Sequence, residues 1–344
     1  MADDTARQVS AEPAASGLKR TDFFAAMRAN RRRTTVLCLG LILLGGVLGY
    51  VIGLAFEVFT AQDPDFALQA GLRLQSMGGL AAGGFMIVFG TLWTLVALFL
   101  GDKIVLGLAG AREVTTDAEP RLHNVVEEMA IAAGLPKPRV YVIETPALNA
   151  FATGLKPEKA AIGVTRGLLD TLSRDELQGV IGHEMGHIAN DDIVYMTAVG
   201  VIVGMVVLIS DVGLRSMRFM SFGGRSRSSS SNKGGNGAAI VMLVILLVFL
   251  ILAPIAAKML QMAISREREY LADATGVKFT RNPLGLIGAL KKIDGSDARF
   301  QGAPKAIQHL FITNPFKKFG ESAGALFSTH PAISQRIERL QNLG

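Results

Sequence analysis

Long uncharged runs dominate the hydrophobic pattern of this chain. The first covers residues 36–56 and the second residues 78–100, and neither contains a charged side chain. A helix rises 1.5 Å per residue, so each run can cross the ~30 Å hydrocarbon core of a bilayer. Two further uncharged runs, 193–210 and 238–257, would form a membrane hairpin, although the former is short and the latter contains Pro254. The pattern predicts four transmembrane helices.

Glycines are spaced along the first two runs at helical intervals. Gly45, Gly49 and Gly53 fall on one helical face, as do Gly79 and Gly83. Small residues let membrane helices approach closely, so we expect these two spans to pack against each other. A cleavable signal peptide is excluded as the reading of the first run, because the run begins too far along the chain and is longer than the apolar region of such peptides.

Basic residues before the first run indicate the orientation of the spans. Six of them lie between residues 19 and 33, whereas segment 57–75 is richer in acids. Positive residues stay on the cytoplasmic side, so the amino terminus is expected there. The segment between the last two runs conflicts with this, because it carries five basic residues and four full crossings would export it. Either the loop is translocated against the tendency or the last hairpin only dips into the membrane.

Shorter patterns outside these runs predict a small mixed domain. A helix is expected over 117–133, capped by Asp117 and ended by Gly134, with His123 beside its apolar stripe as a partly exposed structural histidine. Strands are expected at 139–143, 147–153 and 160–165. A further helix begins after Ser173, whose acidic first turn suits the helix dipole.

Composition narrows the class of protein. Half of the 344 residues are hydrophobic and 19% are charged, below the ~25% of a typical soluble chain. A single cysteine, Cys38, excludes a disulfide scaffold. The net charge of +6 reflects basic residues beside the apolar runs and in the Gly/Ser-rich segment 223–237, which reads as a flexible linker. Nucleic-acid binding is disfavoured, because aromatic residues do not interleave with these charges.

The sequence His183-Glu-Met-Gly-His187 carries the candidate chemistry. Histidines four residues apart project from one helix face toward a single ion. Two imidazoles and a carboxylate on Zn²⁺ leave one position for water, whose pKa falls to about 7, and Glu184 is placed to take its proton. The pattern also occurs by chance on exposed helices, but the capped helix and inward-facing Ile181 and Ile188 favour a zinc site.

A third protein ligand must come from elsewhere in the chain. The candidates are Glu267, Glu269, Asp273, His309 and His330. Glu269 is favoured because it shares a helix face with Asp273, which could accept a hydrogen bond from an imidazole N–H. Arg266, Glu267 and Arg268 are expected to form a solvated face with weak ion pairs.

Four ordered motifs carry a family resemblance. They are NAFATG at 149–154, HEMGH at 183–187, EYLAD at 269–273 and STHP at 328–331. In these motifs, from about the first span to the carboxyl terminus, the chain resembles the HtpX family of membrane-bound zinc metalloproteases, relatives of the CAAX prenyl proteases. The sequence departs from related chains at Asn190-Asp191-Asp192, where a basic residue often stands between Asn and Asp, and in its long linker.

The resemblance implies a role for each matching residue. His183, His187 and Glu269 would bind one Zn²⁺ per chain, Glu184 would be the general base, and Asp273 would orient a ligand. His330 would stabilise the oxyanion with the support of Arg336. The substrate-aligning strand would be Asn149, Ala150, Phe151, Ala152 and Thr153. A strand edge that pairs with extended polypeptide holds many sequences with little selectivity.

These observations combine into one architecture. We expect an α+β protein, mainly helical and integral to the membrane, with four transmembrane helices and a small zincin-like metalloprotease domain containing a short β-sheet. The expected parts are a cytoplasmic segment at 1–34, two membrane helices at 35–101, catalytic segments at 102–192 and 258–344, and a membrane hairpin at 193–257 containing linker 223–237. If the metal-motif helix continues into the third run, zinc lies within about 9 Å of the start of lipid.

The predicted function is zinc-dependent endopeptidase activity on membrane or misfolded proteins, with the amino terminus and active site on the cytoplasmic side. Family analogy indicates quality control and stress response in a bacterial inner membrane. The expected partners are polypeptide substrates, the lipid bilayer and a second copy of the chain. Two alternatives stay open: a non-catalytic membrane zinc scaffold, and a prenyl-protein processing protease. A zinc transporter is disfavoured because the four apolar runs contain no His, Asp or Glu.

Overall fold

The structure is a computed structural model of the 344-residue chain. It describes residues 23–60, 69, 73–202, 255, 266–298, 300, 307, 310–312 and 331–342. The Gly/Ser-rich linker, His309 and His330 lie outside the described residues, as does almost all of the fourth apolar run.

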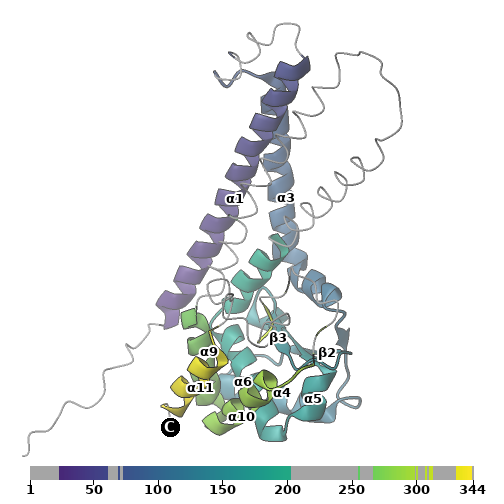
Figure 1. The fold of residues 1–344 in the computed structure, drawn as a ribbon, viewed down its shortest axis with the longest axis vertical. Coiled ribbons are helices and arrows are strands. Elements are labelled where there is room, and N and C mark those ends of the chain that lie inside the picture. The colour runs from purple at the N-terminus through teal and green to yellow at the C-terminus, as the bar shows by residue number, and fades with distance from the viewer. Residues whose placement is uncertain are drawn as a thin grey trace, which may run out of the picture.

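Two long helices rise side by side from the rest of the fold (Figure 1). They are α1 (Phe23–Thr60) and α3 (Met77–Leu108), and each extends beyond the uncharged run that predicted it. Within the described residues, these two helices are long and apolar enough to cross a membrane, judged by length and composition. Large apolar side chains such as Leu43, Phe85 and Phe99 are exposed along them, which favours contact with lipid over burial in a soluble core. Two of the four predicted membrane helices are thus present as candidates.

Glycines allow α1 and α3 to touch along their backbones. A Cβ on Gly49 would lie 2.7 Å from the carbonyl oxygen of Ala82, and one on Gly83 would lie 3.0 Å from that of Gly46. The predicted close approach is confirmed at Gly49, Gly53, Gly79 and Gly83, but Gly45 has no neighbour within 4 Å among the described residues. Glu57 completes the pair, because its carboxylate accepts hydrogen bonds at 2.6 Å from both Ser76 and Gly78 at the start of α3.

A small mixed sheet forms the centre of the remaining domain. Its order is β1-β2-β4-β3, from β1 (Arg112–Glu113), β2 (Arg139–Ile143), β4 (Ala161–Thr165) and β3 (Ala150–Thr153). The pair β2–β4 is parallel and the other two pairs are antiparallel. The three predicted strands are confirmed, with the second one starting at Ala150 rather than Ala147. β3 is an edge strand.

Helices cover both faces of this sheet. On one face, apolar residues of α4 (Pro120–Ala133) and α6 (Arg174–Ala189) pack on Val140, Ile162 and Val164. On the other face, Tyr141 and Phe151 belong to a second core formed with the end of α3 and the helix Asp192–Ile202. The short helices η1 (Pro157–Lys159) and α5 (Arg166–Thr171) flank β4 in the chain. The sheet and α6 therefore share one hydrophobic core, in the domain at the lower end of the long helices (Figure 1).

Three later helices complete the domain. They are α9 (Arg266–Thr280), α10 (Pro283–Asp294) and α11 (Ile333–Gln341). Of these, α9 and α10 pack against α6, and α11 packs against α10 and α9. Leu286, Leu290 and Leu340 join α10 and α11 in a small core of their own. The architecture is mainly helical with a short mixed sheet, as predicted, and the carboxyl-terminal helices complete one side of the domain (Figure 1).

Local details of α4 differ from the prediction. The helix begins at Pro120 and its N-cap is Glu119, which makes no capping side-chain hydrogen bond, so Asp117 is not the cap. Gly134 ends the helix with φ 65°, a left-handed conformation that glycine adopts without strain. His123 is buried rather than partly exposed. Its Nε2 lies 2.9 Å from the carbonyl oxygen of Val114, outside α4, which is consistent with a structural role.

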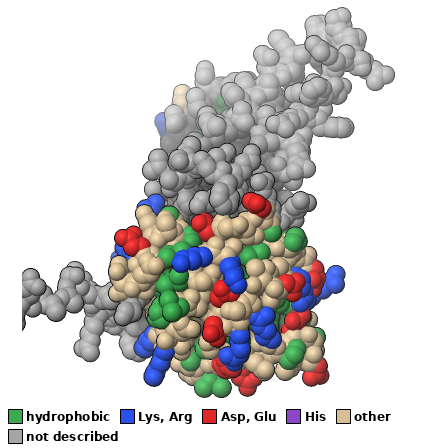
Figure 2. All heavy atoms as spheres, turned by 60° about the horizontal axis from the view of Figure 1, so that its bottom comes forward, with side chains coloured by type: hydrophobic (Ala, Val, Ile, Leu, Met, Phe, Trp, Pro, Cys, Tyr) green, Lys and Arg blue, Asp and Glu red, His purple; other side chains and the backbone are tan. Residues whose placement is uncertain are grey.

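The end of the domain away from the long helices has a polar surface. In Figure 2, Lys and Arg side chains alternate with Asp and Glu across this face, and hydrophobic side chains are interspersed. Mixed charges of this kind are typical of a surface in contact with water. The molecule thus combines an apolar helix pair at one end with a water-facing domain at the other.

Candidate metal centre

The histidine motif lies at the carboxyl-terminal end of α6. Ser173 caps this helix in a capping box with Glu176, as the acidic first turn led us to expect. His183, Glu184 and His187 are at most 4% exposed. The two imidazole rings are nearly perpendicular, with their centroids 4.7 Å apart and their Nε2 atoms 3.2 Å apart.

Helix α9 brings Glu269 to these rings. Its Oε2 lies 3.7 Å from Nε2 of His183 and its Oε1 lies 3.6 Å from Nε2 of His187. One potential ligand atom from each of the three residues can be chosen so that all lie within 4.8 Å of one another. The structure thus brings together the three residues named as ligands from the sequence. It places the carboxylate of Glu267 elsewhere, on the exposed side of the same helix.

Contact between α6 and α9 depends on residues without large side chains. A Cβ on Gly186 would lie 2.8 Å from the carbonyl oxygen of Ala272, and one on Gly276 would lie 2.8 Å from the backbone nitrogen of His183. The two helices therefore touch backbone to backbone beside the histidines. Packing against α9 thus explains Gly182 and Gly186 in the motif helix.

A carboxylate lies behind each histidine. Asp273 Oδ1 is 2.8 Å from Nδ1 of His183, and Asp192 Oδ2 is 3.2 Å from Nδ1 of His187. Such contacts fix the tautomer in which Nδ1 carries the proton and Nε2 is free to bind a metal. Asp192 was missed by sequence reasoning. An aspartate five residues after His187 would have been a signal only if the helix were known to end between them.

The chain turns sharply between α6 and the helix that follows. Asn190 ends α6, and Asp191 has φ 56°, in the left-handed region. A new helix then runs from Asp192 to Ile202 and is largely buried, so α6 does not continue unbroken into the third apolar run, and the condition for the 9 Å distance is not met. The physical reason is that an unbroken helix would rotate residue 192 away from His187, whereas the turn brings its carboxylate back.

The donor atoms fit a divalent metal. If both rings donate from Nδ1 to carboxylates, two nitrogen lone pairs face each other at 3.2 Å, which is unfavourable unless a cation lies between them. Tetrahedral zinc with Zn–N bonds of about 2.0–2.1 Å separates two ligand nitrogens by roughly 3.3 Å. Two nitrogen donors and one carboxylate, all buried, match the donor set of a hydrolytic zinc site.

The charges around the rings differ between the two histidines. Burial and the guanidinium of Arg336 lower the pKa of His183 to about 4. Burial also acts to lower the pKa of His187, but the hydrogen bond to Asp192 and the charge of Glu269 outweigh it and raise the pKa to about 9. The surroundings of His187 therefore favour a positive charge at this point, which a metal ion supplies as well as a proton.

Glu184 is buried next to His183 in α6, and the backbone of Ala152 in β3 hydrogen-bonds its carboxyl group. Burial raises the pKa of its carboxyl group to about 7, although the backbone of Ala152 stabilises the charged form. A general base works best when its pKa is near the operating pH. A buried carboxyl group with a pKa of about 7 thus stands next to His183 in the motif helix.

Strand β3 presents one edge toward Glu184. Thr165 donates its N–H to Asn149 on the side of β4, whereas Ala150 accepts a hydrogen bond from Ile312 on the opposite side. The alternation of a strand therefore turns the backbone groups of Ala150 and Ala152 to the outer edge. The predicted substrate strand is thus an edge strand beside the motif helix, and its side chains are buried.

Arg336 is fully buried between α9, α11 and the histidines. Its Nε and Nη2 donate to the two oxygens of Asp273 at 2.8 and 2.6 Å, and its Nη1 lies 3.6 Å from Glu269. Burial tends to lower the pKa of Arg336, but these carboxylates hold it above its ordinary value. Arg336 was expected to support His330, which lies outside the described residues. In the structure its contacts are with Asp273, Glu269 and His183.

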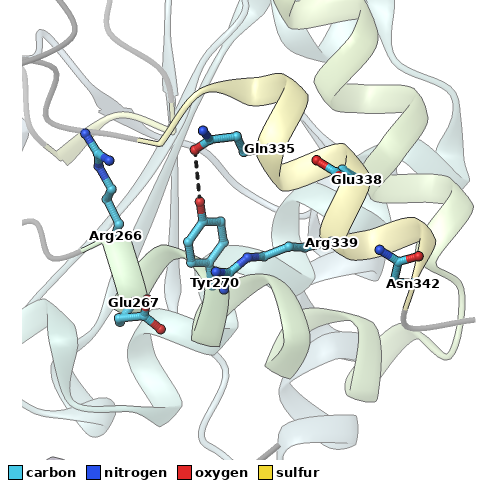
Figure 3. A pocket seen from close by; sticks show the side chains of 7 residues that line it. All are labelled: Arg266, Glu267, Tyr270, Gln335, Glu338, Arg339 and Asn342. Carbon is cyan, nitrogen blue, oxygen red and sulfur yellow. Dashed lines mark hydrogen bonds between the residues drawn. The ribbon is translucent and has the colours of Figure 1, made fainter. Parts of the chain in front are cut away.

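A polar groove lies between α9 and α11 (Figure 3), and neither His183 nor His187 lines it. Arg339 of α11 stacks over the ring of Tyr270, whose hydroxyl donates to Gln335 at 3.3 Å. The groove has a volume of about 470 Å³ and is lined by Arg266, Glu267, Tyr270, Gln335, Glu338, Arg339 and Asn342. Arg266 and Glu267 are exposed here, as predicted, but Arg268 is 7% exposed, so its prediction as a solvated side chain is wrong.

Comparison with known proteins identifies the family. Residues 116–343 match the model of peptidase family M48. The chain belongs to this family. Among its relatives named Protease HtpX homolog, that of Streptococcus uberis is 44% identical over 257 residues, covering 75% of this chain and 84% of that protein. The relative from Listeria monocytogenes is 40% identical over 322 residues, covering 93% of this chain and 99% of that protein.

The match with HtpX proteins extends over the long apolar helices as well as the site. It supports a membrane metallopeptidase, and the M48 family implies a metal at the cluster of His183, His187 and Glu269. A solved structure, that of S. mikatae Ste24p, is 19% identical, covers 92% of this chain and 67% of that chain, and has a TM-score of 0.44.

Proposed function

We propose that this M48 peptidase is a zinc-dependent endopeptidase anchored in a membrane. The observation that carries the proposal is the convergence of His183, His187 and Glu269 beside Glu184, all buried and all supplied by rigid helices. A purely structural zinc site prefers four protein ligands and needs no base next to them. Three ligands and an adjacent carboxylate are the arrangement of a hydrolytic site.

The chain's own residues divide the work of peptide hydrolysis. His183, His187 and Glu269 would hold the ion, with Asp273 and Asp192 fixing the two rings. Zinc bound there would lower the pKa of water and polarise the scissile carbonyl. Glu184 accepts the proton of the attacking water and returns it to the leaving amine, which its pKa of about 7 suits.

Substrate alignment and oxyanion stabilisation complete the proposal. Extended polypeptide pairs with the outer edge of β3, and this pairing requires Ile312 to release the carbonyl oxygen of Ala150, which it occupies in the structure. His330 donates to the developing oxyanion. Arg336 acts through the residues that would hold the metal, because its guanidinium binds Asp273 and approaches Glu269.

Membrane proteins and misfolded chains are the proposed substrates. A site close to two apolar helices meets loops and unfolded ends near the membrane surface, and edge-strand pairing accepts many sequences. The basic residues that precede the first apolar run support a cytoplasmic amino terminus and site, and the HtpX relatives come from bacteria, so the proposed location is a bacterial cytoplasmic membrane. Its role would be protein quality control.

The test is Glu184→Gln in purified protein. We expect this variant to bind one zinc ion per chain and to lose at least ~100-fold of the rate of cleavage of a membrane-protein substrate, since general base catalysis contributes about 10²–10⁴-fold. Glu267→Gln, on the exposed side of α9, is the matched control and should cleave normally. Cleavage by Glu184→Gln at the wild-type rate would contradict the mechanism and favour a scaffold that only binds zinc.

A further inference from the structure

Arg268 is a buried cation next to the third ligand. It is 7% exposed, whereas Arg266 and Glu267 on the same helix are exposed. A guanidinium is seldom buried without acidic or aromatic partners, because removing its charge from water is costly. The contacts of Arg268 therefore indicate what holds it inside.

Asp192 and Tyr195, which follow the end of α6 in the chain, contact this side chain. Nε of Arg268 lies 3.8 Å from Oδ1 of Asp192, and its guanidinium carbon lies 4.4 Å from the centre of the Tyr195 ring. The other oxygen of Asp192 is the one that faces His187, at 3.2 Å. Asp192 is thus held between a cation on one oxygen and an imidazole on the other.

The other histidine of the motif, His183, has the same arrangement. His183 is backed by Asp273, and Asp273 is backed by Arg336. In both cases the order is imidazole, carboxylate, guanidinium, and in both the carboxylate is at most 3% exposed. Two buried carboxylates, Asp192 and Asp273, thus each lie between an imidazole and a guanidinium.

We propose that Arg268 is a positioning residue for the metal centre. It holds Asp192 in the rotamer that orients His187, and the ring of Tyr195 holds Arg268 in turn. The inference rests on the proposed metal site. Because Tyr195 belongs to the helix Asp192–Ile202, the orientation of one metal ligand is coupled to that helix, which packs on α3 where a Cβ on Gly101 would meet Thr197 at 2.9 Å.

The test separates the position of the guanidinium from its charge. Arg268→Lys keeps the charge but loses the planar group that stacks on Tyr195, a change that is not conservative at a stacked site. We expect zinc to leave this variant about tenfold faster than wild type, at the lower end of the 10–100-fold range for residues behind a metal ligand. Zinc release to a chromogenic chelator measures the rate, and the visible spectrum of the cobalt-substituted protein should also change.

Arg266→Lys is the matched control, since it makes the same substitution on the exposed side of α9 and should release zinc at the wild-type rate. A double mutant tests the route of the effect: if Arg268 acts through Asp192, Arg268→Lys should change release less than twofold in an Asp192→Asn background. Should Arg268→Lys fail to fold, Tyr195→Leu replaces it, with faster release expected than for Tyr195→Phe.

Zinc release from Arg268→Lys at the wild-type rate, or an undiminished effect in the Asp192→Asn background, overturns the inference. For the tyrosine pair, equal release from the leucine and phenylalanine variants does the same. Wild-type protein that holds no zinc would instead overturn the proposed function.

Discussion

Alanine at Gly276 is a single-methyl change that should separate the third ligand from the histidines. A Cβ at this position would lie 2.8 Å from the carbonyl carbon of Gly182 and 2.8 Å from the nitrogen of His183. Ordinary carbon contacts begin near 3.4 Å, and these neighbours are backbone atoms of a packed helix that cannot rotate away. We therefore expect α9 to move from α6 by about 0.6 Å at the crossing.

The energetic balance of this change is unfavourable. Alanine gains up to ~1 kcal/mol over glycine in a helix interior, but overpacking a close contact costs ~1–3 kcal/mol. A net loss of stability on the order of 1 kcal/mol follows. The larger consequence is geometric, because Glu269 lies two turns along the same rigid helix, and misplacement of a catalytic group by ~1 Å can cost ~10²-fold in rate. We expect kcat/KM to fall by about 10–100-fold.

The assay compares Gly276→Ala in α9 with Gly179→Ala in α6, and it measures melting temperature, zinc affinity and kcat/KM. A Cβ on Gly179 would collide with the backbone nitrogen of Leu286, so Gly179→Ala overpacks α6 against α10 instead of α9. Both variants should melt at lower temperature, but only Gly276→Ala should lose zinc affinity and turnover. The reasoning is refuted if folded Gly276→Ala keeps wild-type zinc affinity and kcat/KM, or if Gly179→Ala loses zinc to the same extent.

Three further changes test other parts of the fold. Burial tends to raise the pKa of Glu176, but hydrogen bonds from Lys292 and Ser173 hold it below its ordinary value. Glu176→Gln should therefore cost about 1 kcal/mol of stability at pH 7, and its difference in thermal stability from wild type should shrink as the pH falls below about 4.5 through the lowered pKa. A difference that does not change with pH would contradict this. Asp273→Asn leaves Arg336 buried without its main carboxylate and should lower the free energy of unfolding of the metal-free protein by about 3–5 kcal/mol in denaturant titration, whereas a cost below about 1 kcal/mol would mean that Arg336 finds another partner. Gly53→Leu should lower the melting temperature in detergent because α3 occupies the space, whereas Gly45→Leu, with no described neighbour within 4 Å, should not; equal melting temperatures would show that the α1–α3 contact contributes little.

Features set by neighbouring residues were predictable from the sequence. The strand at 139–143 has the predicted bounds, Ser173 caps α6, and Gly134 ends α4, because caps and terminators act within one helical turn. The two long apolar helices follow from the absence of charge over a length that exceeds any ordinary core helix. The three predicted ligand residues converge in space because the spacing of four in α6 and of four in α9 puts the relevant side chains on single helix faces.

Features set by distant contacts were not predictable. Asp117 has the residue type of a cap, yet α4 starts at Pro120, where the fixed φ of proline suits the first helical position. The helix break at Asp191 follows no glycine or proline. Its effect is to bring Asp192 to His187, a contact that only the structure reveals. The burial of Arg268 depends on Tyr195, which the same break brings into reach. A charged helical face alone cannot reveal such partners.

Helix α9 explains why the third ligand can lie so far along the chain from the first two. Three of its residues contact three separate groups: Arg268 reaches Asp192, Glu269 reaches both imidazoles, and Asp273 reaches His183 and Arg336. The glycine crossing at Gly276 fixes the distance of the helix from α6, and the ion pairs on either side of Glu269 fix its rotation. A metal site tolerates errors of only about 0.5 Å in its ligands, so a ligand from a distant segment needs such bracing. Because one brace ends on Tyr195, a shift of the helix Asp192–Ile202 should reach His187 and Glu269 together, and the geometry of the site would then depend on how that helix packs against α3.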